Sequence, residues 1–378
     1  RGAEQCPVSS SIACFLCFFV SILVCSTRIL YNNKDVKYKS PPKSGTVQPA
    51  PVVWLHCCLN LKTKGALHMK LVFLDKKTIG EDIDFSPFRK LGDVVEYDFT
   101  LPEEVPERAA DADVLIVNKI PVNEQTIHTA SHLKLVCVTA TGTNNLDKAY
   151  LDRRGIAWRN VAGFSTDSVA QHTFAMLFYL LEHLRYYDEY VKDRRYLNDT
   201  MFTHFARHFH QISGMTWGII GLGAIGRKVA DLAAVFGADV LYYSASGRDP
   251  QDGYRQVDLD TLLSQSDIIS VHAPLNEYTE NLLDPAAFQK MKSNAILLNL
   301  GRGPIIDETA LADALKNGQI AAAGLDVLSE EPMRASSPLL EILDHDNLLI
   351  TPHIGWASVE ARTRLMQIIA EQIRDFFN

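Results

Sequence analysis

The sequence lacks several features that would each point to a particular class of protein. No uninterrupted apolar run approaches the roughly 20 residues that span a bilayer, which excludes a bundle of membrane-spanning helices. Positive charge is not in excess: 37 Lys and Arg stand against 45 Asp and Glu, a formal net charge of −8, which argues against nucleic acid as the main partner. No repeat occurs at the periods of solenoid proteins. The content of 47% hydrophobic and 22% charged residues over 378 positions excludes wholesale disorder.

Cysteine is scarce beyond residue 68, and methionine is absent before Met69. Six of the seven cysteines fall within residues 1–68, and only Cys137 follows. Charge divides at the same point, with a net of +6 before Met69 and −14 from there on. The apolar stretch 12–25 is short for a membrane span, and it lacks the basic start and the small-residue cleavage site of a signal peptide. We therefore expect residues 1–68 to be a non-native or disordered extension, and the protein from Met69 onward to be cytoplasmic.

From Met69 onward, short apolar segments alternate with helical ones. The predicted strands are 71–74, 94–97, 114–117 and 135–138 in a first set, and 217–220, 240–243, 268–271, 296–299, 322–327 and 348–351 in a second. Apolar strands separated by helices are typical of parallel sheets that are covered on both faces. We therefore predict an α/β fold with two doubly wound parallel-sheet domains. An apolar helix over 168–184, buried between the domains, and an amphipathic helix over 359–377 accompany the strands.

The glycines Gly221, Gly223 and Gly226 form a G-x-G-x-x-G turn between a predicted strand and a predicted helix. This context is the one that a dinucleotide fingerprint requires. The first glycine permits a tight turn, the second lets the backbone approach a pyrophosphate, and the third allows close packing of helix and strand. The N–H groups at the helix start, around Ala224 and Ile225, are expected to face the phosphates. A glycine-rich turn without a ligand is the alternative interpretation.

The acidic residue that NAD enzymes place at the end of the next strand is missing, and Ser244 stands in its place. A serine cannot bind both ribose hydroxyls as a carboxylate does, and it does not repel a 2′-phosphate. Arg248 follows, either as a partner for such a phosphate or as a solvated loop residue. The predicted cofactor is therefore NAD or NADP.

Arg302, Glu331 and His353 follow three successive predicted strands of the second set. In open α/β sheets, residues beyond the carboxyl ends of strands face the ligand crevice. Taken singly, each has a plain structural explanation, as a helix-cap partner, a solvated loop acid and a core histidine. Taken together, they indicate anion binding and proton transfer.

The segment from Met69 to Asn378 resembles the D-isomer-specific 2-hydroxyacid dehydrogenases. The resemblance rests on GLGAIGRKVA, HAPLNEYTENLL, LLNLGRGPIIDETAL, AAAGLDVLSEEP and TPHIGWAS, which occur in the order and spacing of that family. Softer features, such as Trp356 near the histidine, make the chain most similar to the glycerate dehydrogenase (hydroxypyruvate reductase) branch. Ser244 and residues 1–68 depart from the family pattern.

The resemblance implies a role for each candidate residue. Arg302 matches the arginine that holds a 2-oxoacid, His353 the acid/base, and Glu331 the carboxylate that pairs with the histidine. Asp326 resembles the residue that binds the nicotinamide carboxamide. Further cofactor residues implied are His272, Pro274, Thr279 and Leu300, and the implied substrate residues are Lys119, Ile120, Gly142, Thr143 and Asn144.

The resemblance also implies how the chain is divided into domains. A Rossmann cofactor domain over 166–354 is inserted in a flavodoxin-like substrate domain formed by 69–165 and 355–378. Family members are usually dimers built on the cofactor domain, so a homodimer is expected, although a monomer that buries helix 168–184 internally stays open. His204, His208 and His210 have no Cys or carboxylate ligand at helical spacing, so no metal is expected.

The expected reaction is hydride transfer between NAD(P)H and a small 2-oxoacid/D-2-hydroxyacid pair, with hydroxypyruvate and D-glycerate as the leading pair. The nearest alternative is a dehydrogenase of D-3-phosphoglycerate or of another D-2-hydroxyacid. An alternative of another class is a dinucleotide-sensing binding protein. Neither nucleic acid nor a membrane is an expected partner.

Overall fold

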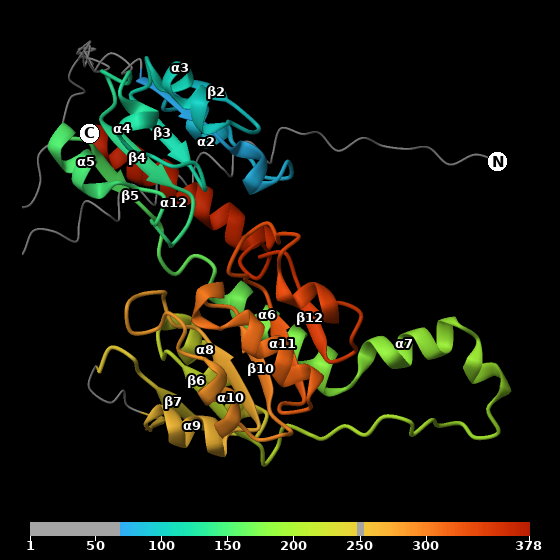
Figure 1. Cartoon of the computed structure of the whole chain (residues 1–378). Helices are drawn as coiled ribbons and strands as arrows, with labels where there is room; N and C mark the ends of the chain where they lie inside the picture. The colour runs from blue at the N-terminus through green and yellow to red at the C-terminus, as the bar shows by residue number, and fades with distance from the viewer. Residues whose placement is uncertain (1–68, 248–252) are drawn as a thin grey trace, which may run out of the picture. The chain divides into compact units, whose positions relative to one another are not determined.

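The structure is a computed structural model, and it describes residues 69–247 and 253–378 (Figure 1). The predictions for residues 1–68, including the apolar stretch 12–25, and for Arg248 lie outside the described residues. Among the helices within these two ranges, none combines the length and the apolarity needed to cross a bilayer.

The first sheet has five parallel strands in the order β2-β1-β3-β4-β5. The strands are β1 (Met69–Phe73), β2 (Gly92–Glu96), β3 (Val114–Val117), β4 (Leu135–Val138) and β5 (Ala157–Arg159). Short helices connect them: η1 (Lys76–Ile79), α2 (Ser86–Arg89), η2 (Pro102–Glu104), α3 (Val105–Ala109), α4 (Glu124–Ile127) and α5 (Lys148–Arg154). Every residue of β3 and β4 is buried, which is why both strands are uninterrupted apolar runs in the sequence.

Two hydrophobic cores lie on the two faces of this sheet. Leu71 belongs to one core and its neighbour Val72 to the other, as the alternation of side chains along a strand requires. The last helix, α12 (Val359–Phe377), contributes Leu365 and Ile369 to the first core, and both side chains are fully buried. The face of this sheet is thus completed by a segment about 200 residues further along the chain (Figure 1).

The second sheet has seven parallel strands in the order β12-β11-β10-β9-β6-β7-β8. The strands are β6 (Thr216–Ile220), β7 (Asp239–Tyr243), β8 (Arg255–Gln256), β9 (Ile268–Val271), β10 (Ile296–Asn299), β11 (Ala322–Leu325) and β12 (Leu348–Ile350). The connecting helices are α8 (Ala224–Val235), α9 (Leu259–Gln265), α10 (Pro285–Lys290), η4 (Gly303–Ile305), α11 (Glu308–Lys316) and η5 (Pro338–Ile342). The strand order reverses between β6 and β9, and such a switch point opens a ligand crevice at the carboxyl ends of the strands.

Helix α6 (Thr166–Leu181) packs against α8 and against β10 and β11 of this sheet. Met176 and Leu180 lie so close to Gly324 of β11 that a Cβ on this glycine would stand 3.2 and 3.3 Å from their side chains. These contacts account for the apolar residues of α6. Helix α6 begins two residues before the predicted helix 168–184 and ends three residues before its end. It ends early because His183 adopts a left-handed conformation (φ 52°).

The segment over residues 182–211, which we call the arm, has no buried side chain. It comprises α7 (Leu184–Lys192), η3 (Arg195–Asn198) and an irregular stretch, and Figure 1 shows α7 running out beyond the seven-stranded sheet. Many of its exposed side chains are large and apolar: Leu184, Val191, Leu197, Met201, Phe202, Phe205 and Phe209. Phe202 is the extreme case, with 91% of its surface exposed.

The predicted α/β fold with two parallel sheets is confirmed, and every predicted strand is present with its ends within two residues of the prediction. Two strands escaped prediction, β5 and β8. Both are edge strands of two or three residues with no fully buried side chain, so they leave no apolar run in the sequence. The division into domains at 69–165 with 355–378 and at 166–354 stays a prediction.

Candidate active site

The three strands that precede Arg302, Glu331 and His353 are neighbours in the seven-stranded sheet. β10, β11 and β12 are adjacent and parallel, so the segments that follow them emerge at the same edge. The structure therefore brings to one edge three side chains that are up to 51 positions apart in the sequence.

Glu331 and His353 form a hydrogen-bonded pair at this edge. Oε2 of Glu331 lies 2.7 Å from Nδ1 of His353, and Oε1 accepts a hydrogen bond of 3.0 Å from the backbone N–H of Leu328. Burial alone would raise the pKa of Glu331, but the contact with His353, together with the charge of Lys119, lowers it. Glu331 is thus a carboxylate at neutral pH, and it fixes the imidazole through Nδ1.

The turn that carries His353 is held by the carboxylate of Asp326. His353 has a φ of 54°, which is unfavourable for a residue other than glycine, so the turn needs external support. Asp326 is 3% exposed and accepts hydrogen bonds from Thr351 Oγ1 (2.7 Å), Ile354 N (2.8 Å) and Gly355 N (2.8 Å). Burial acts to raise the pKa of Asp326, but the hydrogen bonds it accepts outweigh burial and lower it.

The guanidinium of Arg302 is oriented by the backbone around it. Nη1 donates to the carbonyl oxygen of Gly301 at 2.7 Å, and the side-chain amide of Asn299 donates to the carbonyl oxygen of Arg302 at 3.0 Å. Nη2 lies 2.8 Å from the point where a Cβ would stand on Gly142. Gly142 therefore lets the loop after β4 approach the guanidinium closely, which a side chain would prevent.

The predicted substrate residues lie on two loops of the five-stranded sheet. They are Lys119 and Ile120 after β3, and Gly142, Thr143 and Asn144 after β4. The two loops are tied together, because the side-chain amide of Asn145 donates to the carbonyl oxygen of Ile120 at 2.9 Å. Gly142 approaches Arg302 closely, and the charge of Lys119 acts on Glu331. Both loops therefore lie at the candidate active site.

Asp75, which the sequence analysis missed, fixes the loop after β3. Its side chain is 4% exposed, and its carboxylate oxygens accept hydrogen bonds of 2.8–2.9 Å from the N–H groups of Asn118 and Lys119. Burial nevertheless keeps the pKa of Asp75 above its usual value. An acidic residue directly after a buried strand was the available signal.

The glycine-rich turn has the geometry that a dinucleotide requires. Gly221 has a φ of 94°, and a Cβ there would lie 2.8 Å from the backbone of Ala273. A Cβ on Gly226 would lie 2.2 Å from the carbonyl oxygen of Gly221, so the helix start and the turn are in tight contact. Gly223, by contrast, has nothing within 4 Å of its ideal Cβ position and directly precedes α8. Open space beside the amino end of this helix, where Ala224 and Ile225 lie, fits a pyrophosphate.

His272 adds a second sign of a ligand in the crevice. It follows β9, and both of its ring nitrogens are buried and without a hydrogen-bond partner. Burial lowers its pKa to about 3, so the imidazole is neutral. Buried polar groups are rarely left unpaired, so these nitrogens fit a cofactor that supplies the missing partner.

The other predicted cofactor residues differ in the contacts and the exposure of their side chains. Ser244 follows β7 directly, and its hydroxyl lies 3.3 Å from that of Ser246. The buried hydroxyl of Thr279 donates to the carbonyl oxygen of Pro274 at 2.7 Å, so it stabilises its own loop. Leu300, which is 7% exposed, follows β10. The functional roles of all these residues stay predictions.

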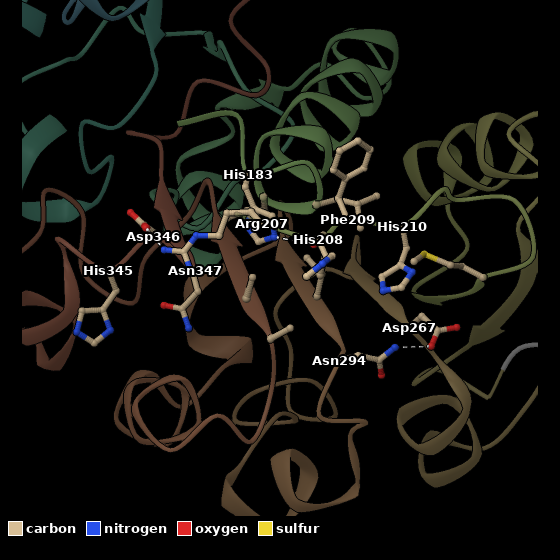
Figure 2. A pocket seen from close by; sticks show the side chains of 16 residues that line it. His183, Arg207, His208, Phe209, His210, Asp267, Asn294, His345, Asp346 and Asn347 are labelled. Carbon is tan, nitrogen blue, oxygen red and sulfur yellow. Dashed lines mark hydrogen bonds and ion pairs between the residues drawn. The ribbon is translucent and has the colours of Figure 1, made fainter. Parts of the chain in front are cut away.

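A separate cavity of about 450 Å³ lies at the opposite edge of the seven-stranded sheet. It is lined by Ile296 and Ala322, the first residues of β10 and β11, and by side chains of the arm. Figure 2 shows His183, His208, His210 and His345 around it. It contains none of the predicted site residues.

The histidines at 204, 208 and 210 do not converge. The ring of His204 stacks on Tyr190 with centroids 3.9 Å apart, whereas His208 and His210 line the cavity. Over residues 69–247 and 253–378, no three His, Cys, Asp or Glu side chains are grouped as metal ligands would be.

Comparison with known proteins places the chain in a family. Residues 174–355 match the family described as D-isomer specific 2-hydroxyacid dehydrogenase, NAD binding domain. A glycerate dehydrogenase of Methylorubrum extorquens is 38% identical over 307 residues, which cover 81% of this chain and 94% of that protein. The chain belongs to the D-isomer specific 2-hydroxyacid dehydrogenases.

Two further proteins are similar to this 2-hydroxyacid dehydrogenase, one in sequence and one in structure. A hydroxypyruvate reductase of Blautia hydrogenotrophica is 36% identical over 315 residues, covering 82% of this chain and 97% of that protein. The solved structure of an acyclic imino acid reductase in complex with NADPH and D-Arg gives a TM-score of 0.72 at 30% identity, covering 82% and 97% of the two chains. The predicted family, enzyme class and NAD(P) cofactor are confirmed.

Proposed function

We propose that this 2-hydroxyacid dehydrogenase reduces a small 2-oxoacid to the D-2-hydroxyacid, with hydroxypyruvate and D-glycerate as the leading pair. The observation that carries the proposal is the hydrogen-bonded pair of Glu331 and His353, which lies at the same sheet edge as Arg302. The names of the relatives in Methylorubrum extorquens and Blautia hydrogenotrophica support this pair of compounds.

The roles of the three side chains follow from their chemistry. When bound, the nicotinamide cofactor supplies or accepts the hydride. Arg302 presents a planar cation that binds the carboxylate or the carbonyl oxygen of the 2-oxoacid and polarises the C=O bond. Because Glu331 occupies Nδ1, His353 uses Nε2 to donate a proton to the carbonyl oxygen as the hydride reaches carbon. In the reverse direction, Nε2 removes the proton of the hydroxyl group, and Glu331 stabilises the imidazolium that results.

Cofactor binding is assigned to the crevice at the switch point. The open space beside Gly223 and the amino end of α8 would hold the pyrophosphate, and a bound cofactor would supply the partner that the buried ring nitrogens of His272 lack. Asp326 would accept a hydrogen bond from the nicotinamide carboxamide. Ser244 leaves the choice between NAD and NADP open, because it carries no charge that would repel a 2′-phosphate.

One spectrophotometric assay tests the substrate. Oxidation of NADH and NADPH is followed with hydroxypyruvate, glyoxylate, pyruvate and 3-phosphohydroxypyruvate as substrates. We expect hydroxypyruvate to give the highest kcat/KM. Preference for 3-phosphohydroxypyruvate would identify the nearest alternative enzyme, and absence of turnover with tight NADH binding would contradict the proposed function.

We also propose that the protein is a homodimer in which the arm packs against a second copy. The arm buries none of its side chains, although Leu197, Phe202 and Phe205 are large and apolar and are 70–91% exposed. Several large apolar side chains exposed on one segment are typical of an interaction site. Light scattering should give the mass of a dimer for the natural chain, and Phe202→Asp with Phe205→Asp should give that of a monomer. A monomeric natural chain would refute the proposal.

The domain division and the location of the protein belong to the same proposal. Packing of α12 on the five-stranded sheet supports a substrate domain formed by 69–165 and 355–378, and limited proteolysis between these parts and 166–354 tests it.

The free, buried Cys137 fits a reducing compartment, which supports the cytoplasm, and cell fractionation tests this.

A further inference from the structure

His172 lies on α6, outside every motif that carries a predicted site residue. It nevertheless contacts Thr351, at the start of the segment that carries His353. Nε2 of His172 is 3.0 Å from Thr351 Oγ1 and 3.4 Å from Asp326 Oδ1. One turn earlier on α6, the hydroxyl of Ser168 donates to the carbonyl oxygen of Gly355 at 2.7 Å. The first turns of α6 therefore support both ends of the segment 351–355.

The hydrogen bonds around Thr351 determine where the proton of His172 lies. Thr351 Oγ1 has one proton, and it donates this proton to Oδ1 of Asp326 at 2.7 Å. Toward His172 the threonine oxygen can therefore only accept, so Nε2 of His172 must carry a proton. The same N–H faces Asp326 Oδ1, and the two contacts form a triangle of donor, relay and carboxylate.

Asp326 depends on this triangle, because its carboxylate is buried and its hydrogen bonds from Ile354 N and Gly355 N are stronger when it is charged. Burial would raise its pKa, and the hydrogen bond from His172 is a major factor that lowers it. Space is equally restricted: a Cβ on Gly355 would stand 2.8 Å from Asp326 Oδ2 and 3.4 Å from Cδ2 of His172.

We propose that His172 is a positioning residue, which holds the Asp326 carboxylate and, through it, the left-handed turn that presents His353 to the substrate. It acts through Thr351 and Asp326. The inference rests on the proposed function, because it assigns His353 to proton transfer and Asp326 to the nicotinamide.

Two variants of the full chain separate hydrogen bonding from packing. His172→Leu removes the donor and keeps an apolar side chain on α6, whereas His172→Gln keeps an N–H donor. Thr173→Val is the matched control, because Thr173 is the next residue on α6, is fully buried, and donates only to Val169 O of its own helix. We expect His172→Leu to lower kcat about 10- to 100-fold with the 2-oxoacid KM within about threefold.

The pH profile and the binding of NADH give readouts that a packing defect would not change in this way. Loss of the donor lets Asp326 take up a proton at higher pH, so the acidic limb of the kcat profile should move to higher pH. The NADH Kd should rise at least about fivefold, or roughly 1 kcal/mol, in His172→Leu. His172→Gln should recover most of both effects, and Thr173→Val should show neither.

The outcomes are distinct. Natural-like kcat, pH profile and NADH Kd in His172→Leu would overturn the proposal, and so would equal impairment of the Leu and Gln variants with an unchanged pH profile. If the natural chain binds NADH but reduces no 2-oxoacid, the proposed function is wrong. In that case the NADH Kd values of the same three variants still decide whether His172 holds Asp326.

Discussion

At the scale of single residues, two carboxylates of the candidate site hold the catalytic imidazole in position. Glu331 orients His353, and Asp326 supports the turn on which His353 lies in a left-handed conformation. Loss of either carboxylate should lower activity without any direct contact to the substrate, because each fixes the position of the imidazole. The residue whose removal should cost most is nevertheless His353 itself.

Replacement of His353 by Ala should lower kcat for 2-oxoacid reduction at least about 100-fold, because it removes the imidazole Nε2 that is proposed to deliver the proton. NADH binding, followed by fluorescence, should be retained. His345→Ala is the control, since His345 is exposed and lines the cavity at the opposite edge of the sheet. Near-normal turnover of His353→Ala would remove this residue from the acid/base role.

Ser244 gives a prediction about cofactor choice. Asp at this position would accept hydrogen bonds from the ribose hydroxyls of NADH and repel the 2′-phosphate of NADPH. The ratio of kcat/KM for NADH to that for NADPH should therefore rise at least about tenfold in Ser244→Asp, which corresponds to about 1.4 kcal/mol. An unchanged ratio would show that Ser244 does not face the ribose.

The pKa of Glu331 predicts how stability depends on pH. Its pKa is lower in the folded protein than the ordinary value of 4.5, because the contact with His353 outweighs burial, so the unfolded chain takes up the proton first as the pH falls. The stabilisation is therefore complete above pH 4.5 and is lost as the pH falls through the pKa of the folded state. Thermal unfolding between pH 3 and 7 should show a steeper acidic fall of Tm in the natural chain than in Glu331→Gln. Parallel curves would contradict this reading.

At the scale of helices and strands, α12 determines whether the five-stranded sheet has a complete core. Ile369 is fully buried in that core. Ile369→Ala should lower the free energy of unfolding by about 2–5 kcal/mol, through lost burial and the cavity left behind. Urea unfolding measures this, with the exposed Gln367→Ala as a control expected to change it by less than about 0.5 kcal/mol. A similar value for the two variants would mean that the site collapses without cost.

The elements that the sequence reveals are those with a strong apolar signature. β3 and β4 are buried along their whole length, and the segments 114–117 and 135–138 could therefore be predicted to the residue. Arg302, Glu331 and His353 were found because each follows a predicted apolar strand. β5 and β8 are edge strands without a fully buried side chain, and they left no comparable signal.

The residues that escaped prediction act through contacts distant in sequence. His172 is 179 positions from Thr351, and Asp75 is 43 positions from Asn118. On its own, a histidine in an apolar helix gives no sign of a partner, and the split between α6 and α7 depends on the backbone of His183. Such features follow from tertiary structure, which a local pattern does not contain.

At the scale of the whole molecule, loops of the five-stranded sheet meet residues of the seven-stranded sheet at the guanidinium of Arg302. A methyl group on Gly142 would stand 2.8 Å from Nη2, so the guanidinium has to move. Gly142→Ala should raise the KM for the 2-oxoacid about tenfold while the KM for NADH stays within about twofold. Steady-state kinetics measure both, with the exposed Ala149→Ser of α5 as control. Unchanged substrate KM would place the oxoacid away from this contact.

Completion of the five-stranded sheet by α12 has a consequence for biosynthesis. β1 to β5 leave the ribosome early, but Leu365 and Ile369, which cover one face of their sheet, follow only after the entire seven-stranded sheet has been made. Contacts separated by about 200 to 300 positions close slowly, and until then Leu71 and its neighbours present an uncovered apolar face. We therefore expect the nascent chain to depend on a chaperone most during elongation, before α12 docks.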